Sequence, residues 1–105
     1  MDVPLDNGIY LTNSGIFNNN LGGTINITDV SDADHSLQID ANSNAIPATF
    51  TNAGILTITN GVDHSLRIQE DGVFTNSAGG VLNIINANTK GILLESGAVL
   101  KVMNI

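Results

Sequence analysis

The sequence lacks several features that often indicate how a protein is stabilised or where it acts. Its 105 residues include no cysteine and no tryptophan, so disulfides cannot stabilise the fold. No segment approaches the roughly 18 consecutive apolar residues of a membrane-spanning helix, and we expect no membrane insertion. The first residues, MDVPLDNG, show neither the basic nor the apolar region of a secretion signal.

Basic residues are also scarce. Three lysines and arginines stand against ten acidic residues, which gives a net charge of −7. Because such a charge repels phosphate backbones and anionic lipid surfaces, nucleic acid is not expected as a partner.

The residues that are present favour one folded β domain. Hydrophobic residues make up 42% of the chain and charged residues 12%, a balance too apolar for a typical disordered chain. Isoleucine, leucine and valine are mixed with asparagine, threonine, serine and glycine, as is typical of strands and turns. At this length we expect a single domain, residues 1–105.

Three short phrases recur along the chain. The first reads GIFNNN at 15–20, ATFTNAG at 48–54 and GVFTNSAGG at 72–80. The second reads GGTINI at 22–27, GILTI at 54–58, GGVLNI at 79–84 and KVMNI at 101–105. The third reads DHSLQID from 34, DHSLRIQEDG from 63, KGILLESG from 90 and, at the front, NGIYLTNSG from 7.

The alternation and the period of these phrases predict the architecture. Pairs such as Ile25 and Ile27 place apolar side chains on one face of a strand. The interval is 33 residues from Phe17 to Phe50 and 24 from Phe50 to Phe74, as in a solenoid with loop insertions. We predict an all-β fold, a right-handed parallel β-helix (β-solenoid) of about four turns of three short strands, with the handedness usual for parallel crossovers. A β-sandwich also has short strands, but the repetition favours turns that lie on one another.

Turns about 4.8 Å apart would place equivalent residues in columns. The residues expected in an aromatic column, an amide ladder and an aliphatic column are Phe17, Phe50 and Phe74; Asn19, Asn52 and Asn76; and Ile27, Ile58 and Ile84. Asparagine suits a corner because it tolerates left-handed backbone and its amide can bond to the next amide in the column.

Phrases such as FTNAGILTITNG and FTNSAGGVLNI resemble the parallel β-helix repeats of bacterial surface and secreted proteins, including filamentous-haemagglutinin-like adhesins and autotransporter passengers. The resemblance covers nearly the whole chain. It implies an elongated extracellular or cell-surface scaffold or adhesin without catalytic residues. Those proteins have many more turns than the four expected here.

Neither end of the sequence carries the polar or helical cap that solenoids normally use. The residues expected to contact a neighbouring copy at these ends are Leu5, Ile9, Tyr10, Leu11, Val99, Leu100, Val102, Met103 and Ile105. Since the chain starts in the third phrase and KVMNI reads as the second, we expect a whole number of turns and head-to-tail stacking of identical copies into an extracellular filament. The small number of residues from Gly97 to Ile105 counts against this position in the three-strand cycle, because it leaves little room for both a first-phrase and a second-phrase strand.

A segment of a larger β-helical surface adhesin, binding carbohydrate or another surface, would also lack caps. The sequence leaves this alternative open beside the filament subunit.

No residue cluster predicts catalysis. Enzymes built on β-helices use clustered carboxylates, calcium and a basic residue, whereas Arg67, Lys90 and Lys101 are scattered along this chain. We therefore expect no enzymatic activity and no cofactor. The outward columns of the second phrase mix asparagine, threonine and isoleucine, without the regular threonine plane of ice-binding solenoids.

Two polar features remain as candidate binding sites. The pairs Asp34-His35 and Asp63-His64 would lie in adjacent turns and form a small surface patch able to orient a metal or a proton, although a corner motif with solvated histidines is the simpler interpretation. The acidic run at 29–34 offers oxygen ligands to calcium, but it has no second copy, which favours a solvated loop.

Overall fold

The computed structural model describes residues 8–28, 35–42, 46–60, 64–87 and 90–103. Within these ranges the alternating phrases form short strands separated by corners. The strands are β1 (Ile9–Thr12), β2 (Ile16–Asn19), β3 (Thr24–Thr28), β4 (His35–Asp40), β5 (Thr49–Asn52), β6 (Ile55–Thr59), β7 (His64–Gln69), β8 (Val73–Asn76), β9 (Val81–Ile85), β10 (Lys90–Leu94) and β11 (Val99–Val102).

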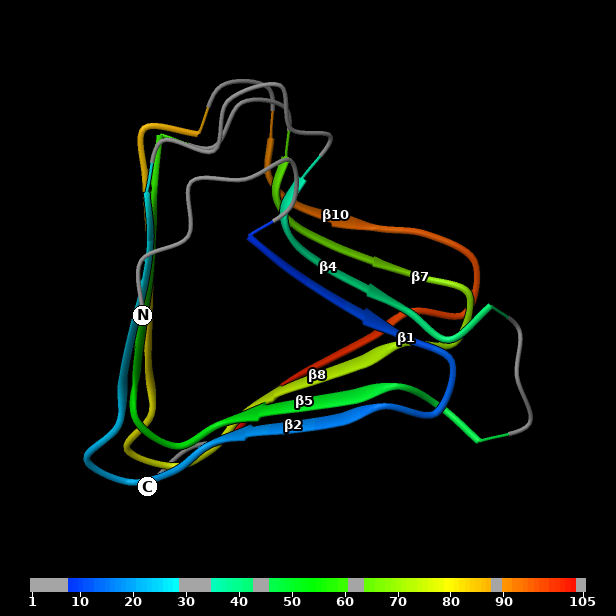
Figure 1. Cartoon of the computed structure of the whole chain (residues 1–105), viewed down its shortest axis with the longest axis horizontal. Coiled ribbons are helices and arrows are strands. Elements are labelled where there is room, and N and C mark those ends of the chain that lie inside the picture. Colours follow the sequence, from blue (N-terminus) through cyan, green and yellow to red (C-terminus); the bar gives the residue numbers. More distant parts are fainter. Residues whose placement is uncertain (1–7, 29–34, 43–45, 61–63, 88–89, 104–105) are drawn as a thin grey trace.

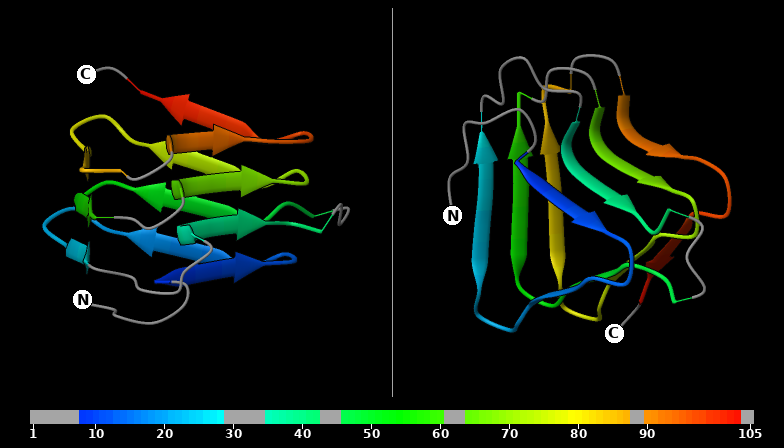
Figure 2. Two further views of the ribbon diagram at one scale, coloured as in Figure 1. Left: turned by 90° about the horizontal axis from the view of Figure 1, so that it is seen from above. Right: turned by 45° about the vertical axis from the view of Figure 1, so that its right-hand side comes forward.

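The strands form three parallel sheets, because the chain returns to the same side after every third strand. Sheet A consists of β1, β4, β7 and β10, sheet B of β2, β5, β8 and β11, and sheet C of β3, β6 and β9. Viewed along the stack, sheet C lies at the left, sheet B below and sheet A at the upper right of a triangle (Figure 1). Figure 2 shows the turns stacked in sequence order, with β1 at one end and β11 at the other. The predicted right-handed parallel β-helix of about four turns is confirmed.

The register aligns equivalent residues of successive turns, so that inward side chains form six columns in the described residues. These are Ile9–Leu37–Leu66–Ile92, Leu11–Ile39–Ile68–Leu94, Phe17–Phe50–Phe74–Leu100, Asn19–Asn52–Asn76–Val102, Ile25–Leu56–Leu82 and Ile27–Ile58–Ile84. The apolar residues in the middle of the columns are fully buried, and each such side chain contributes about 1.5–3 kcal/mol through burial. The core is therefore the stack itself.

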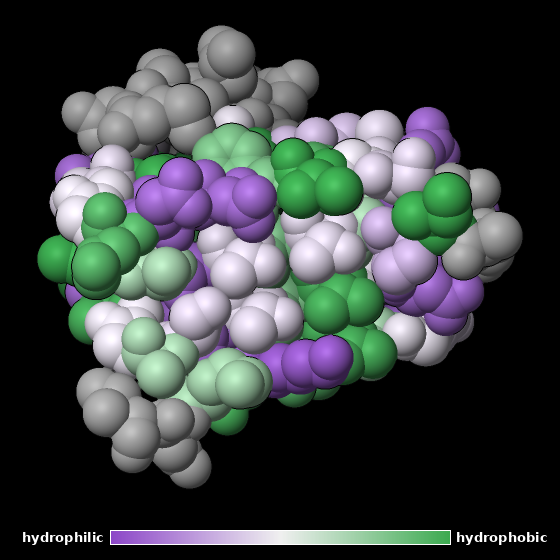
Figure 3. Space-filling model, turned by 90° about the horizontal axis from the view of Figure 1, so that it is seen from below, coloured by the Kyte–Doolittle hydropathy of each residue, from purple (hydrophilic) through white to green (hydrophobic). Residues whose placement is uncertain are grey.

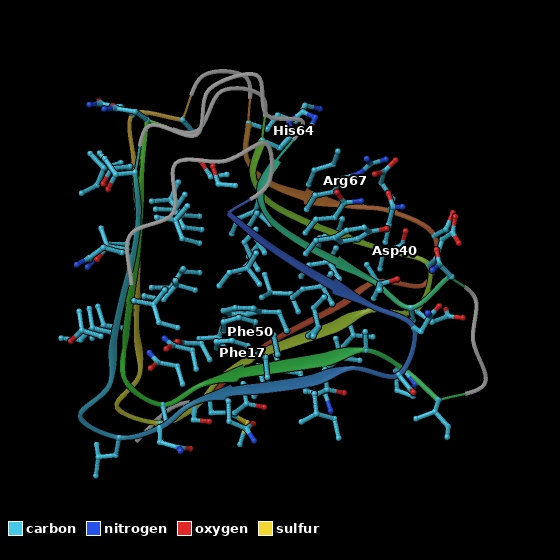
Figure 4. All side chains as sticks on the ribbon, in the orientation of Figure 1. Phe17, Asp40, Phe50, His64 and Arg67 are labelled. Atoms are coloured by element: carbon cyan, nitrogen blue, oxygen red, sulfur yellow. The ribbon has the colours of Figure 1, made fainter. Side chains whose placement is uncertain are left out.

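The phenylalanines of sheet B form one continuous stack of rings. The ring centroids of Phe17 and Phe50 are 4.7 Å apart with an interplanar angle of 11°, and those of Phe50 and Phe74 are 5.3 Å apart at 17°. Figure 4 shows the Phe17 and Phe50 rings lying over one another inside the triangle. This geometry follows from the turn spacing of about 4.8 Å, which leaves room for rings only when they are nearly parallel.

An amide ladder runs beside the rings, at the corner between sheets B and C. Asn19 Nδ2 donates to Asn52 Oδ1 at 2.8 Å, and Asn52 Nδ2 donates to Asn76 Oδ1 at 2.8 Å. The same amides donate to the backbone of the corner, from Asn52 to the Val81 carbonyl and from Asn76 to the Gly80 carbonyl, both at 2.9 Å. Because buried polar groups need partners, the ladder allows this corner to be buried.

The predicted phase of the last strand is wrong. β11 pairs with β8 in sheet B, which places Leu100 opposite Phe74 and Val102 opposite Asn76. The strand is therefore a copy of the first phrase and not of the second, and the described residues do not amount to a whole number of turns. The physical reason is the corner at Gly97. Just after this corner, Val99 donates its N–H to the Gly72 carbonyl at 3.0 Å, so the chain enters sheet B directly.

We predict that Asn52→Ala lowers the free energy of unfolding by at least about 2 kcal/mol, because Asn76 Oδ1 and the Val81 carbonyl each lose the Asn52 donor, at roughly 1–3 kcal/mol per unsatisfied group. Urea denaturation followed by circular dichroism measures this loss. Asn83→Ala, at an exposed position of sheet C, is the matched control and should change stability by at most about 0.5 kcal/mol. Equal losses in the two variants would contradict a stabilising role for the ladder.

Candidate functional site

The inward columns end uncovered in the last described turn. Ile92, Leu94 and Val102 are 38%, 47% and 68% exposed. Leu66 and Ile68, which lie one turn below Ile92 and Leu94 in sheet A, are fully buried. All of these positions point inward in their strands, so the difference arises because no described turn lies above the last one. This end of the stack presents an apolar surface that is continuous with the core.

An open hollow of about 410 Å³ lies at this end. Its walls include Phe74, Asn76, Leu82, Ile92, Leu100 and Val102. Sheets A and B each have a fourth strand here, but within the described ranges sheet C stops at β9. The hollow therefore lies where a fourth strand of sheet C would continue the columns, and β9 offers that strand a main-chain edge.

The opposite end of the stack starts with β1 and β2. Ile9, Leu11 and Phe17 are the inward side chains of this first turn, and they are partly buried against the core. Tyr10 alternates with Ile9 and Leu11, pairs with Gln38 on the next strand and is 49% exposed. The first turn thus offers apolar inward positions to a further turn, with Tyr10 on the outside.

The residues predicted to contact a neighbouring copy do not lie on one common surface. The inward columns contain Ile9, Leu11, Leu100 and Val102. Tyr10 and Val99 alternate with inward residues and lie on outer faces, and Met103 follows β11 with 54% exposure. Leu5 and Ile105 lie outside the described residues. The sequence-based list missed Ile92 and Leu94, although the 26-residue offset from Leu66 to Ile92 matches the offset from Phe74 to Leu100.

The repeated histidines occupy paired main-chain positions in sheet A. β4 and β7 pair His35 with His64, and β10 adds Lys90 to the same column. Asp34 and Asp63, the other members of the predicted patch, lie outside the described residues, as does the acidic run considered for calcium. Within the described part of the chain, no group of three or more histidine or carboxylate side chains could hold a metal ion. The patch stays a prediction.

The outer face of sheet A carries polar and charged side chains. Gln69 Nε2 donates to Asp40 Oδ2 at 2.6 Å, and Arg67 forms a hydrogen-bonded ion pair with Glu95. Figure 4 shows Asp40 and Arg67 pointing outward from the sheet. The Arg67 and Glu95 side chains are 26% and 37% exposed, so their pair contributes little stability. Asp40 is only 4% exposed, and the Gln69 amide supplies a hydrogen bond to its carboxylate.

Two serine hydroxyls are buried in sheet A. Ser36 and Ser65 are fully buried on adjacent strands, and neither Oγ atom has a hydrogen-bond partner among the described residues. Although Ser65 directly follows His64, its burial denies a substrate access to the hydroxyl. Burying a hydroxyl without a partner costs stability, so we assign these serines no chemical role.

No protein-family model, curated protein or solved structure matches the chain. The solenoid repeat itself is established by the three parallel sheets. The resemblance to bacterial surface proteins stays a prediction. Across the ranges that the structure describes, no helix is long and apolar enough to cross a membrane.

We predict that Ser65→Ala raises the free energy of unfolding by about 1 kcal/mol, because the variant no longer buries a hydroxyl without a partner, a cost of roughly 1–3 kcal/mol. Urea denaturation measures the change. Ser96→Ala, at an exposed corner, is the control and should stay within about 0.5 kcal/mol of the parent protein. A clear loss of stability in Ser65→Ala would show instead that its hydroxyl makes a stabilising contact.

Proposed function

We propose that this chain is a structural protein, a β-solenoid subunit that stacks head to tail with copies of itself into an extracellular filament or appendage. The observation that carries the proposal is the apolar end of the stack, where Ile92, Leu94 and Leu100 continue buried columns but are covered by no described turn. A second copy supplies strands whose spacing and register match those at the end of sheets A and B.

The residues that would meet at such a join are compatible. If β1 of one copy lies on β10 of another, Ile9 falls on Ile92 and Leu11 on Leu94; with β2 on β11, Phe17 falls on Leu100. Each contact is apolar on apolar. The fourth column would place Asn19 against Val102, so the amide ladder would not continue across the join.

The energetics favour assembly that depends on concentration. Fully burying an aliphatic side chain contributes about 1.5–3 kcal/mol, and the three partly exposed side chains of the last turn, together with those of the first, gain a part of this each. Association costs an estimated 4–15 kcal/mol in lost translational and rotational freedom. The free energy gained by burying side chains at the join and the free energy lost on association are of the same order. The main-chain hydrogen bonds across the join would therefore decide whether threads form.

A second candidate function is favoured by the position beside β9, where the described residues place no fourth strand of sheet C. In the cycle a sheet C strand follows each sheet B strand, so the position beside β9 belongs in phase to a strand that would follow β11. A chain that continued through this position would be one segment of a longer β-helical surface adhesin that binds carbohydrate or another surface. The resemblance of the repeats to adhesins and autotransporter passengers supports the cell surface as the location in both cases.

We predict that Leu94→Lys abolishes long assemblies, because it places a charge on the apolar end while the side chain is already 47% exposed in one copy. Sedimentation velocity over a concentration series measures the assemblies, and circular dichroism checks the fold. Ile46→Lys is the matched control, since Ile46 is 63% exposed on the connection between β4 and β5, away from both ends.

Persistence of long assemblies in Leu94→Lys would contradict stacking through this end. If the parent protein sediments as a monomer at every concentration, the filament proposal fails and the adhesin segment remains.

A further inference from the structure

Two of the three outer faces carry almost no charge. The acidic residues in the described ranges all lie in, or directly after, strands of sheet A: Asp40, Glu70, Asp71 and Glu95. The strands of sheets B and C, with the corners that join them, contain one charged residue, Lys101. In a chain with a net charge of −7, this continuous surface, here called the neutral surface, carries no acidic side chain among the described residues.

The neutral surface also exposes apolar side chains. They are Ile16, Leu21, Ile55, Val81, Ile85 and Val99, of which Leu21 is 88% exposed and Ile16 is 72% exposed. Figure 3 views the molecule from the side of sheet B, where a band of pale and green residues runs from one end of the stack to the other. Main-chain pairing keeps these side chains in rows, so the band extends with the stack.

A notch interrupts this surface at the corner between sheets B and C. The corner spans residues 20–23 in the first turn and 77–80 in the third, but only residues 53–54 in the second. The shorter middle corner leaves a hollow of about 260 Å³, with Leu21, Ile55 and Val81 among its lining residues.

Backbone forms the floor of the notch. A Cβ atom added to Gly54 would lie 2.2 Å from the Gly23 carbonyl oxygen, so a larger residue at this position would displace the chain.

We propose that a second copy of this chain docks on the neutral surface, with Leu21 of each copy seated in the corner notch of the other. Charge favours this arrangement of two copies, because chains that each carry −7 repel one another least when they approach across a surface whose described residues include no acidic side chain. Geometry agrees, because the projecting Leu21 and the notch lie side by side on one corner. Two copies related by a two-fold axis therefore satisfy both contacts at once.

This lateral contact goes beyond end-to-end stacking and does not need it. Within a filament, each subunit would repeat the projecting leucine and the notch along the corner. Two filaments would then pair through a row of identical contacts, whose strengths combine along the row.

The test uses chains whose ends are blocked by Leu94→Lys, so that lateral pairing is measured separately from stacking. We expect this variant to form dimers in sedimentation equilibrium, and we expect added salt to tighten them because it screens the repulsion between like charges. Adding Leu21→Lys should weaken the dimer at least about tenfold, as for loss of a central apolar contact. Adding Ile46→Lys, also an exposed apolar residue but outside the neutral surface, should leave the dimer unchanged.

A cross-link provides the second measurement. The natural chain has no cysteine, so Leu21→Cys introduces a single thiol, and in the two-fold contact the two thiols come close together. A short bis-maleimide should give dimers from Leu21→Cys and none from Ile46→Cys, at the same protein concentration and with ends blocked.

Two results would overturn the lateral contact. One is a blocked-end chain that stays monomeric at every salt concentration, and the other is a dimer that Leu21→Lys leaves intact. Neither bears on stacking, because the parent protein can still form single threads in electron micrographs.

Discussion

Main-chain pairing between successive turns is the interaction on which the rest of this structure depends. Because parallel strands lie about 4.8 Å apart and in register, the nearest neighbour of each inward side chain is its equivalent one turn away. A column therefore works best when the same side chain recurs, since like shapes stack without gaps. This explains why Phe50 lies between two phenylalanine rings and why Asn52 accepts from one amide and donates to the next.

The same constraint makes the ends of the stack different from its middle. A side chain such as Ile68 is buried because turns lie above and below it, whereas Leu94 occupies the equivalent inward position and is 47% exposed. No local change in residue type separates them; the number of covering turns does. The proposed head-to-tail stacking supplies the missing turn, and a longer chain would supply it in the same way.

Much of the fold could be predicted from the sequence, because the alternation fixes strands and the repeats fix which strands lie together. The Phe and Asn columns follow from equivalent positions in the first phrase. The phase of the last strand could not be predicted from residue types, since KVMNI resembles the second phrase, while the corner at Gly97 directs Leu100 onto Phe74 in sheet B. The corner notch beside Leu21 also escaped prediction, because it depends on one corner being two residues shorter than those on either side.

Fibre diffraction from aligned specimens of the purified chain tests most directly whether this solenoid continues from one copy into the next. Stacking with continuous main-chain pairing predicts threads that give a meridional reflection at about 4.8 Å. Isolated particles at every concentration, or threads without that reflection, would contradict the account and show that the turns do not continue across a join.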